Sequence, residues 1–268
     1  MEINNYIDTH AHFSLCMEDD GYTEEYLFKE MKDAGIECAV QVSTEKSEFE
    51  WCMNFADKHQ SIMYTLGIHP SSNFSNDDLD CLDKLLGKIS SLPIYEKLFG
   101  IGEIGLDYFW DKEKKNEQMR LFESQLSIAR KYSQPVIIHS RDALPDTKVM
   151  LKNSGISNGI IHCFSGNVDD AKDFLNLGFH ISFAGNLTYK KSVNLHDAVK
   201  YVPDDRLFLE TDCPYLSAQP VRGKKNHPAW VIHTYQFAAD KRGVAVHTLA
   251  DRINENFQEF RQKGRLQK

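Results

Sequence analysis

The chain has 268 residues, 41% of them hydrophobic and 26% charged, with a formal net charge of −8. This composition suits a globular protein with a sizeable core, and the negative charge argues against a broad basic surface for duplex DNA. No apolar run reaches the roughly 18 residues of a membrane span, and no signal peptide is visible at the N-terminus. We therefore expect one domain over residues 1–268, a monomer in the cytoplasm without membrane contact.

Apolar runs rich in β-branched residues recur along the chain and predict strands. They cover residues 6–9, 36–42, 62–68, 98–101, 136–138, 159–161, 179–183 and 207–209. Most are almost continuously apolar, as in parallel strands that are covered on both faces. Helical spacing of apolar residues occurs between them, for example in residues 116–132 and 249–260. The alternation predicts an α/β fold, and eight repeats predict a (β/α)8 TIM barrel.

Six metal-ligating side chains close these runs or follow them directly. A parallel barrel gathers the carboxyl ends of its strands in one mouth, so we expect these side chains to converge. Imidazole and carboxylate groups in this number can hold two divalent metal ions, with Zn, Mn and Mg as candidates. The pattern therefore predicts a metallohydrolase with these candidate ligands: His10, His12, Glu103, His139, His162 and Asp212.

The candidate ligands have different expected roles. His10 and His12 share one face of a strand and can approach one ion, although two polar loop residues would give the same pattern. Asp8 shares that face and is expected to orient a ligand. Glu103 lies among glycines, and its two carboxylate oxygens can bridge two ions. Asp212 is expected to bind an ion and to accept the proton of the attacking water, so Glu103 and Asp212 are the predicted catalytic residues.

The cysteines are expected to be free thiols. Six are present, without a C-x-x-C pair. Cys163 and Cys213 directly follow two candidate ligands. Neighbouring residues of a strand point to opposite faces, so we do not expect either thiolate to bind a metal.

Further residues near the strand ends are candidates for substrate binding. The most loop-like stretches, residues 71–80 and 218–228, both follow strand ends. The second contains a basic cluster that suits a phosphate, although a solvated surface turn is an equally good interpretation. Two aromatic rings suit base stacking, with core packing as the alternative. The predicted substrate-binding residues are His69, Arg141, Phe164, Tyr215, Arg222, Lys224 and Lys225.

Six strings of the sequence resemble the TatD family of metal-dependent deoxyribonucleases. They span residues 7–216 in order, and the likeness continues to about residue 230. The strings are Ile-Asp-Thr-His-Ala-His (7–12), Gly-Ile-His-Pro (67–70), Gly-Glu-Ile-Gly-Leu-Asp-Tyr (102–108), Pro-Val-Ile-Ile-His-Ser-Arg-Asp-Ala (135–143), His-Cys-Phe-Ser-Gly (162–166) and Glu-Thr-Asp-Cys-Pro-Tyr-Leu (210–216).

The resemblance implies a (β/α)8 barrel of the amidohydrolase type with two divalent ions. It implies that one ion is held by His10, His12, Glu103 and Asp212, and the other by Glu103, His139 and His162. It also implies hydrolysis of DNA phosphodiester bonds by a metal-activated water, at single strands or 3′ ends. The chain departs from the family pattern at His227, where a carboxylate is usual, and at Ser71, where a histidine is common.

Two alternatives to a deoxyribonuclease remain at this point. The same metal centre can attack a carbonyl, which would make the chain an ester or amide hydrolase such as an aminoacyl-tRNA deacylase. A binding protein with purely structural metals is the other alternative. It is disfavoured because structural zinc sites are closed and four-coordinate, whereas shared ligands at a barrel mouth leave positions for water.

Overall fold

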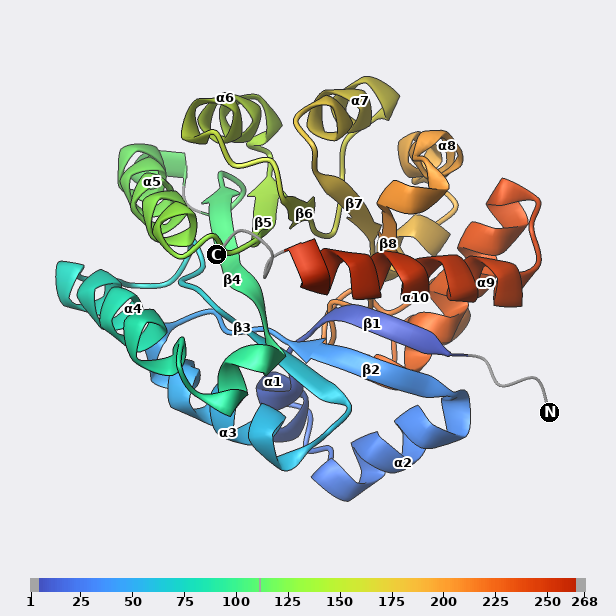
Figure 1. Ribbon diagram of the computed structural model, residues 1–268. Helices are drawn as coiled ribbons and strands as arrows, with labels where there is room; N and C mark the ends of the chain where they lie inside the picture. The colour runs from blue at the N-terminus through green and yellow to red at the C-terminus, as the bar shows by residue number, and fades with distance from the viewer. Residues whose placement is uncertain (1–4, 111, 264–268) are drawn as a thin grey trace. The chain divides into compact units, whose positions relative to one another are not determined.

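The computed structural model describes residues 5–110 and 112–263, and within these ranges eight strands alternate with helices (Figure 1). The strands are β1 (Tyr6–Ala11), β2 (Ile36–Gln41), β3 (Ile62–Leu66), β4 (Leu98–Asp107), β5 (Val136–Arg141), β6 (Gly159–Ile161), β7 (His180–Phe183) and β8 (Leu207–Leu209). Each predicted run overlaps one of them, and β1, β4 and β5 extend beyond their predicted ends. The predicted α/β class of the (β/α)8 TIM-barrel type is confirmed.

Helices fill the segments between strands and follow the last one. They are α1 (Phe13–Glu18), α2 (Glu24–Ala34), α3 (Phe49–Lys58), α4 (Asn76–Ile89), α5 (Lys115–Lys131), α6 (Leu144–Ser154), α7 (Val168–Asn176), α8 (Val193–Tyr201), α9 (Val231–Arg242) and α10 (Val246–Lys263). Short 3-10 helices are η1 (Lys46–Glu48), η2 (Pro93–Lys97), η3 (Lys112–Lys114), η4 (Gly185–Thr188), η5 (Asp204–Arg206), η6 (Gln219–Val221) and η7 (Pro228–Trp230).

The predicted loop 71–80 was too long, because α4 already begins at Asn76. Ser75 caps this helix together with Asp78, whose Oδ2 accepts the Ser75 backbone N–H at 2.8 Å. A serine followed three residues later by an acidic residue is a helix start signal.

The contacts of the chain group it into two compact units. Of the described residues, the first contains 5–40, 163–172 and 181–260, and the second contains 41–110, 112–162, 173–180 and 261–263. Strands β1, β2, β7 and β8 thus belong to the first unit, and β3 to β6 to the second. The predicted single domain stays a prediction.

In the second unit, β4 is the longest strand and is buried along its whole length. It pairs in parallel with β3 and with β5, where Gly105 lies opposite His139 and Asp107 opposite Arg141. Gly105 has φ +144°, and a Cβ atom there would lie 2.0 Å from the His139 carbonyl oxygen. Only glycine fits such an approach, which lets β4 continue six residues beyond its predicted end at Ile101.

In the first unit, β7 pairs in parallel with β8, and β8 lies next to β1. Beyond β8 the backbone N–H of Asp212 donates to the His10 carbonyl at 2.9 Å. Behind these strands the Tyr235 hydroxyl of α9 donates to the Ile7 carbonyl at 3.0 Å and accepts the Ile7 N–H at 3.2 Å. The ring of Phe260 in α10 packs on Phe208 of β8 with centroids 5.9 Å apart. The ends of β1 and β8 are therefore held together.

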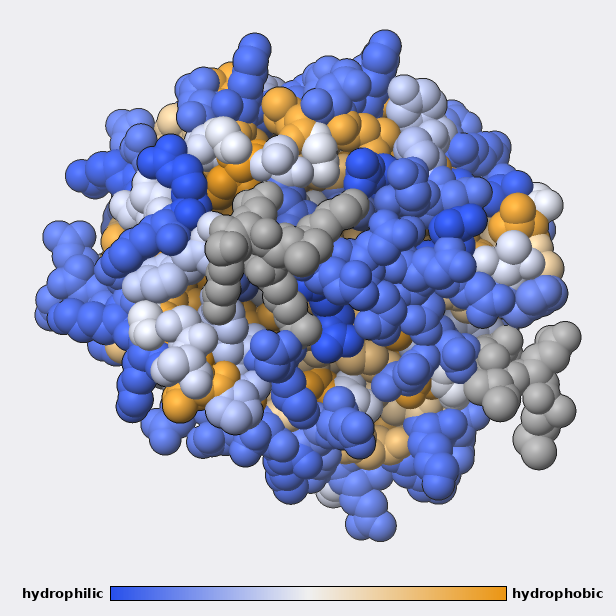
Figure 2. Space-filling view, in the orientation of Figure 1, coloured by the Kyte–Doolittle hydropathy of each residue, from blue (hydrophilic) through white to orange (hydrophobic). Residues whose placement is uncertain are grey.

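The surface view in Figure 2 shows hydrophilic side chains over most of one face, with hydrophobic ones in small separate areas. Among the described residues, the exposed large hydrophobic side chains include two neighbours, Phe109 and Trp110. None of the helices in the described part of the chain has both the length and the hydrophobicity of a membrane span.

Candidate metal centre

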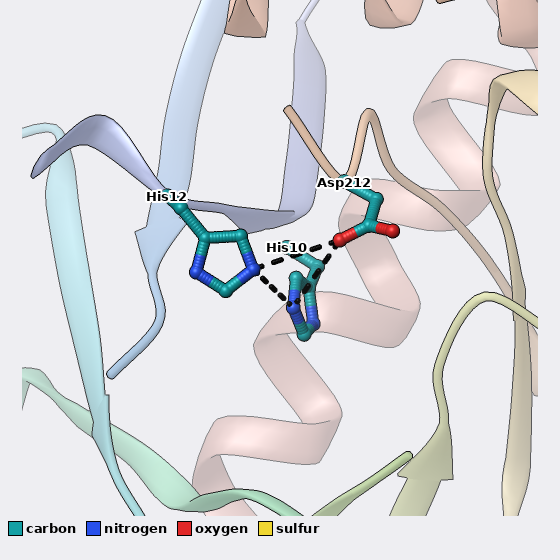
Figure 3. Close-up of side chains that lie close together, drawn as sticks. All are labelled: His10, His12 and Asp212. Atoms are coloured by element: carbon teal, nitrogen blue, oxygen red, sulfur yellow. Dashed lines mark hydrogen bonds and ion pairs between the residues drawn. The ribbon is translucent and has the colours of Figure 1, made fainter. Parts of the chain in front are cut away.

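The first unit contains a histidine–aspartate cluster made by His10, His12 and Asp212 (Figure 3). The two imidazole Nε2 atoms lie 3.3 Å apart, and Asp212 Oδ1 lies 3.7 Å from His10 Nε2 and 3.6 Å from His12 Nε2. In a tetrahedral shell with bonds of 2.0–2.1 Å, ligand atoms are about 3.4 Å apart. The three atoms are thus spaced like ligands of one ion.

The backbone places these three side chains. His10 and His12 occupy alternate positions at the end of β1 and just beyond it, so they share a face. Asp212 has the positive φ of 54°, a conformation that aspartate tolerates better than most residues. With its N–H bonded to the His10 carbonyl, this turn brings the carboxylate over the histidines. The side chains are almost fully buried, with Asp212 the most exposed of the three at 13%.

Asp8 supports the histidine–aspartate cluster through the backbone. Its Oδ1 accepts the N–H groups of Thr211 at 2.9 Å and His10 at 3.3 Å, and its Oδ2 accepts the Thr211 hydroxyl at 2.6 Å. Full burial raises the pKa of Asp8 to about 8, although these hydrogen bonds lower it. The carboxyl group therefore fixes the segments that carry His10 and Asp212, whereas its predicted action on a ligand side chain is not seen in these contacts.

The second unit contains a glutamate–histidine cluster made by Glu103, His139 and His162. Glu103 Oε1 lies 2.7 Å from His139 Nδ1 and 2.7 Å from His162 Nε2, and the two nitrogens are 3.2 Å apart. Glu103 is held in β4 by its backbone N–H, which donates to the Ser43 carbonyl at 3.0 Å. Three donor atoms of metal-ligating types thus meet at one point.

Asp107 orients one histidine of the glutamate–histidine cluster, and the sequence interpretation missed it. Its Oδ2 lies 3.1 Å from His139 Nε2, on the opposite side of the ring from Glu103. Burial would lower the pKa of His139, but the hydrogen bonds of Asp107 and Glu103 raise it above its ordinary value. A carboxylate on the far nitrogen of a histidine is the usual support of a metal ligand, because it fixes the tautomer. The signal was present, since Asp107 follows Glu103 by four residues on the same strand face.

His69 lies next to the glutamate–histidine cluster. Its Nε2 is 3.6 Å from Glu103 Oε1, and its Nδ1 accepts the Ser71 N–H at 3.1 Å. Burial lowers the pKa of His69 to about 3, so the ring is neutral and carries its proton on Nε2. His69, Glu103 and His139 also lie close enough together to hold a metal ion, so the predicted role of His69 in substrate binding stays a prediction.

A second supporting carboxylate, Glu210, was also missed. It is fully buried, its Oε1 accepts the Cys163 N–H at 2.6 Å, and its Oε2 accepts the Ser182 hydroxyl at 2.6 Å. Cys163 has the positive φ of 42°. Glu210 thus secures a strained turn at the end of β6. Its sequence signal was weak, because a glutamate at a strand end is more often solvated.

The basic cluster of the loop 218–228, formed by Arg222, Lys224 and Lys225, already has contacts within the protein. The Lys225 ammonium donates to the Asp20 carbonyl at 2.8 Å and lies 3.4 Å from its carboxylate, while Tyr22 donates to the Lys225 carbonyl at 2.8 Å. Lys224 is exposed, and the Arg222 guanidinium lies 4.3 Å from the centre of the Tyr189 ring. Arg222 and Lys224 therefore remain suited to a phosphate, whereas Lys225 already has an anionic partner.

His227 in the same loop packs against aromatic rings. Its ring centroid lies 5.5 Å from that of Tyr22 and 4.3 Å from that of Trp230. Burial, followed by the charge of His233, lowers the pKa of His227 to about 4. The neutral ring thus has a packing role.

The two predicted stacking residues differ in accessibility. Tyr215 is 53% exposed, and its ring centroid lies 6.3 Å from that of His12. Phe164 is only 1% exposed and packs edge-on against Phe183 at 5.8 Å. The prediction that Phe164 stacks on a base is thus corrected to core packing, because its ring offers no free face. Arg141 is exposed at the end of β5 and lies over the ring of Phe109.

The donor atoms fit divalent metal ions. Nitrogen and oxygen ligands suit zinc, manganese or related ions, and each cluster combines imidazoles with one carboxylate. The role of Glu103 as a ligand shared by two ions stays a prediction. The six cysteines are free, and the buried Cys213 makes none of these contacts.

Comparison with known proteins agrees with this chemistry. A family model described as "TatD related DNase" matches residues 7–262. The uncharacterized metal-dependent hydrolase YabD of Bacillus subtilis is 34% identical over 93% of this chain and 96% of its own length. The uncharacterized metal-dependent hydrolase YcfH of Escherichia coli K12 is 34% identical over 94% of this chain and 93% of its own length.

Solved structures show the same fold. The crystal structure of YjjV, a TatD homologue from Escherichia coli K12, superposes with a TM-score of 0.88 at 29% identity, over 95% of this chain and 96% of that one. An organophosphorus hydrolase mutant from Deinococcus radiodurans has a TM-score of 0.60 at 13% identity, over 96% of this chain and 93% of that one, which speaks for the fold alone. The chain belongs to the TatD-related DNase family and is a metal-dependent hydrolase.

Proposed function

We propose that this hydrolase is a deoxyribonuclease that cleaves phosphodiester bonds of single-stranded DNA or of 3′ ends with two divalent metal ions. One ion is assigned to the histidine–aspartate cluster and one to the glutamate–histidine cluster. The observation that carries the proposal is the presence of two such clusters in a member of a family described as TatD-related DNases. The cytoplasmic location and the monomeric state belong to the same proposal.

Divalent ions in these clusters would polarise a phosphoryl oxygen and make a bound water acidic near neutral pH. We assign to Asp212 the role of proton acceptor for such a water. Its Oδ1 faces the two imidazoles, and its second carboxylate oxygen points away from them (Figure 3). The carboxylate is also the part of the histidine–aspartate cluster that solvent reaches best. Glu103 and the imidazoles are largely buried and serve as ligands.

Charged and aromatic side chains support a nucleic acid as the substrate. Arg222 and Lys224 follow the turn of Asp212 in the chain, and Arg141 lies two residues beyond His139. Tyr215, three residues from Asp212, has an exposed ring. Guanidinium groups bind phosphate and aromatic rings stack on bases, which a small neutral ester would not require.

A nuclease assay tests the proposal. The protein is stripped of metal, reloaded with Zn²⁺, Mn²⁺ or Mg²⁺, and incubated with an end-labelled single-stranded oligonucleotide. We expect cleavage by the wild type and a loss of at least about a hundredfold in Asp212→Asn, because proton acceptance alone is worth that much. Asp197→Asn on α8, a largely exposed aspartate, is the matched control and should cleave normally.

Protein that holds stoichiometric metal but leaves the oligonucleotide intact with all three ions would contradict the proposal. The ester or amide alternative then gains support if an aminoacyl ester is cleaved instead. Reversal of charge in Arg222→Glu/Lys224→Glu separates the two substrates further. It should cripple cleavage of nucleic acid and spare that of a small neutral ester.

A further inference from the structure

Two neighbouring aromatic side chains are exposed in the turn after β4. Phe109 is 53% exposed and Trp110 is 70% exposed. Their ring centroids lie 4.9 Å apart with an interplanar angle of 89°, so the two rings present differently oriented faces. A single exposed hydrophobic residue requires no explanation, but adjacent aromatic rings next to a candidate active site suit a binding surface.

An arginine completes this group. The Arg141 guanidinium carbon lies 3.8 Å from the centre of the Phe109 ring and 5.5 Å from that of Trp110. Strand pairing brings it there, since Arg141 lies opposite Asp107 and its carbonyl accepts the Tyr108 N–H at 2.9 Å. A guanidinium on an aromatic face keeps N–H donors at its edge, which suit a phosphate oxygen.

Asp107 fixes this turn beside the glutamate–histidine cluster. Its Oδ1 accepts the backbone N–H groups of Phe109 at 3.0 Å and Trp110 at 3.2 Å. Its Oδ2 is the oxygen that holds His139. One buried carboxylate therefore sets both the orientation of a candidate metal ligand and the conformation of the aromatic turn.

The chain continues from the turn with exposed charges of both signs, Glu113 among them. Lys112 and Lys114 in η3 are both exposed. Aromatic rings beside a cationic side chain, here Arg141, are the combination that proteins use to bind single strands, because every base has a stacking face and the backbone is anionic. Bases of a duplex are already stacked on each other and are not available in this way.

We propose that Phe109, Trp110 and Arg141 form a base-stacking subsite, the aromatic platform, for single-stranded DNA. The ring of Trp110 stacks on a base, Phe109 supports it, and Arg141 contacts an adjacent phosphate. This inference rests on the proposed function for the identity of its ligand. It assigns to these residues the recognition of a strand whose backbone reaches the glutamate–histidine cluster.

Binding in the presence of EDTA tests the aromatic platform without cleavage. The probes are a labelled oligothymidylate and an abasic strand of equal length, and the readout is the ratio of their dissociation constants by fluorescence anisotropy. Loss of base stacking weakens binding by about tenfold. The wild type should therefore prefer the strand with bases, Trp110→Ala should lose about tenfold of this preference, and Trp110→Phe should restore it.

The ratio separates stacking from an indirect effect. A change that only disturbs the turn or its charge weakens both strands alike and leaves the ratio as in the wild type. Tyr201→Ala on α8 removes another exposed ring and is the matched control, with an unchanged ratio expected. A wild-type ratio in Trp110→Ala, or equal binding of both strands by the wild type, would overturn the platform.

The metal-loaded cleavage assay described above tells the two proposals apart. Base preference that depends on Trp110, without cleavage under any metal, would retain the platform and refute the nuclease. If the wild type cleaves the oligonucleotide but the ratio of dissociation constants is the same in Trp110→Ala, the platform is refuted and the nuclease is retained.

Discussion

At the scale of single residues, Asp107 links two parts of the second unit. Its Oδ2 faces His139 Nε2, which leaves the other ring nitrogen, Nδ1, directed at Glu103. Burial would raise the pKa of Asp107, but the hydrogen bond and the charge of His139, together with the backbone N–H groups of Trp110 and Phe109, outweigh it and lower this pKa. The group is therefore an ionised acceptor, and it selects the tautomer in which Nδ1 is available to a metal.

We predict that Asp107→Asn weakens metal binding at one site by about 10–100-fold. The amide oxygen can satisfy the turn, but then its NH2 group faces His139 Nε2 and favours the wrong tautomer. Calorimetric titration of the metal-free protein with Zn²⁺ measures the change. Asp83→Asn, an aspartate paired with Lys131 at the surface, serves as the control. Two unaltered sites in Asp107→Asn would refute this role.

His227 should make stability depend on pH. Burial, then the charge of His233, lowers its pKa from the ordinary 6.5 to about 4 in the folded state. Between pH 6.5 and 4 the unfolded chain thus binds more protons at this residue, so the contribution to folding is lost as pH falls. We predict that the free energy of unfolding falls by roughly 2 kcal/mol more in the wild type than in His227→Gln when the pH is lowered from 7 to 4. Urea unfolding at both pH values measures this, and parallel losses in the two proteins would argue against it.

At the scale of elements, the geometry of β4 depends on glycine. We predict that Gly105→Ala lowers the free energy of unfolding by about 3 kcal/mol or more, because the methyl group would overlap the His139 carbonyl. Gly155→Ala is the matched control. Gly155 also has a positive φ, of 71°, but open space around its Cβ position. Gly155→Ala should therefore lower the free energy of unfolding by only about 1 kcal/mol. Denaturant titration compares the two variants. Equal decreases in the free energy of unfolding would show that the close approach of Gly105 to the His139 carbonyl does not determine the effect.

Most elements could be predicted from the sequence because strand positions are apolar on both faces. The run at residues 159–161 matches β6 to the residue, and that at 207–209 matches β8. The end of β4 could not be predicted in this way. Glycine is unfavourable in strands, so a glycine-rich stretch indicates a turn, and only the tertiary approach of β5 explains its conformation.

The candidate ligands could be predicted from strand ends, and spacing puts Asp107 on the strand face of Glu103, but the contacts of the supporting carboxylates could not be predicted. His10, His12 and Asp212 lie together, as do Glu103, His139 and His162. The supports Asp107 and Glu210 depend on which atoms their carboxylates meet, which sequence spacing leaves open. For the same reason, sequence could not tell the buried Phe164 from the exposed Trp110.

At the scale of the whole molecule, the two clusters predict two separable metal sites. We predict that the wild type retains two ions after dialysis, and that His12→Ala and His139→Ala each lose one of them. Removal of one imidazole leaves a cluster with too few ligands, while the other cluster keeps its own. Elemental analysis measures the number of metal ions per protein molecule. Loss of both ions in either variant would instead show that the sites depend on each other.

The spacing within β4 also constrains how such a protein can change. Glu103 and Asp107 reach the two nitrogens of one imidazole because Asp107 is the fourth residue after Glu103 on a single strand, and an even spacing keeps both on one face. Insertion or deletion of one residue between them would turn one carboxylate to the opposite side and dismantle the support. Length variation between Glu103 and Asp107 is therefore excluded, and redesign of specificity should leave this segment intact and begin beyond Trp110.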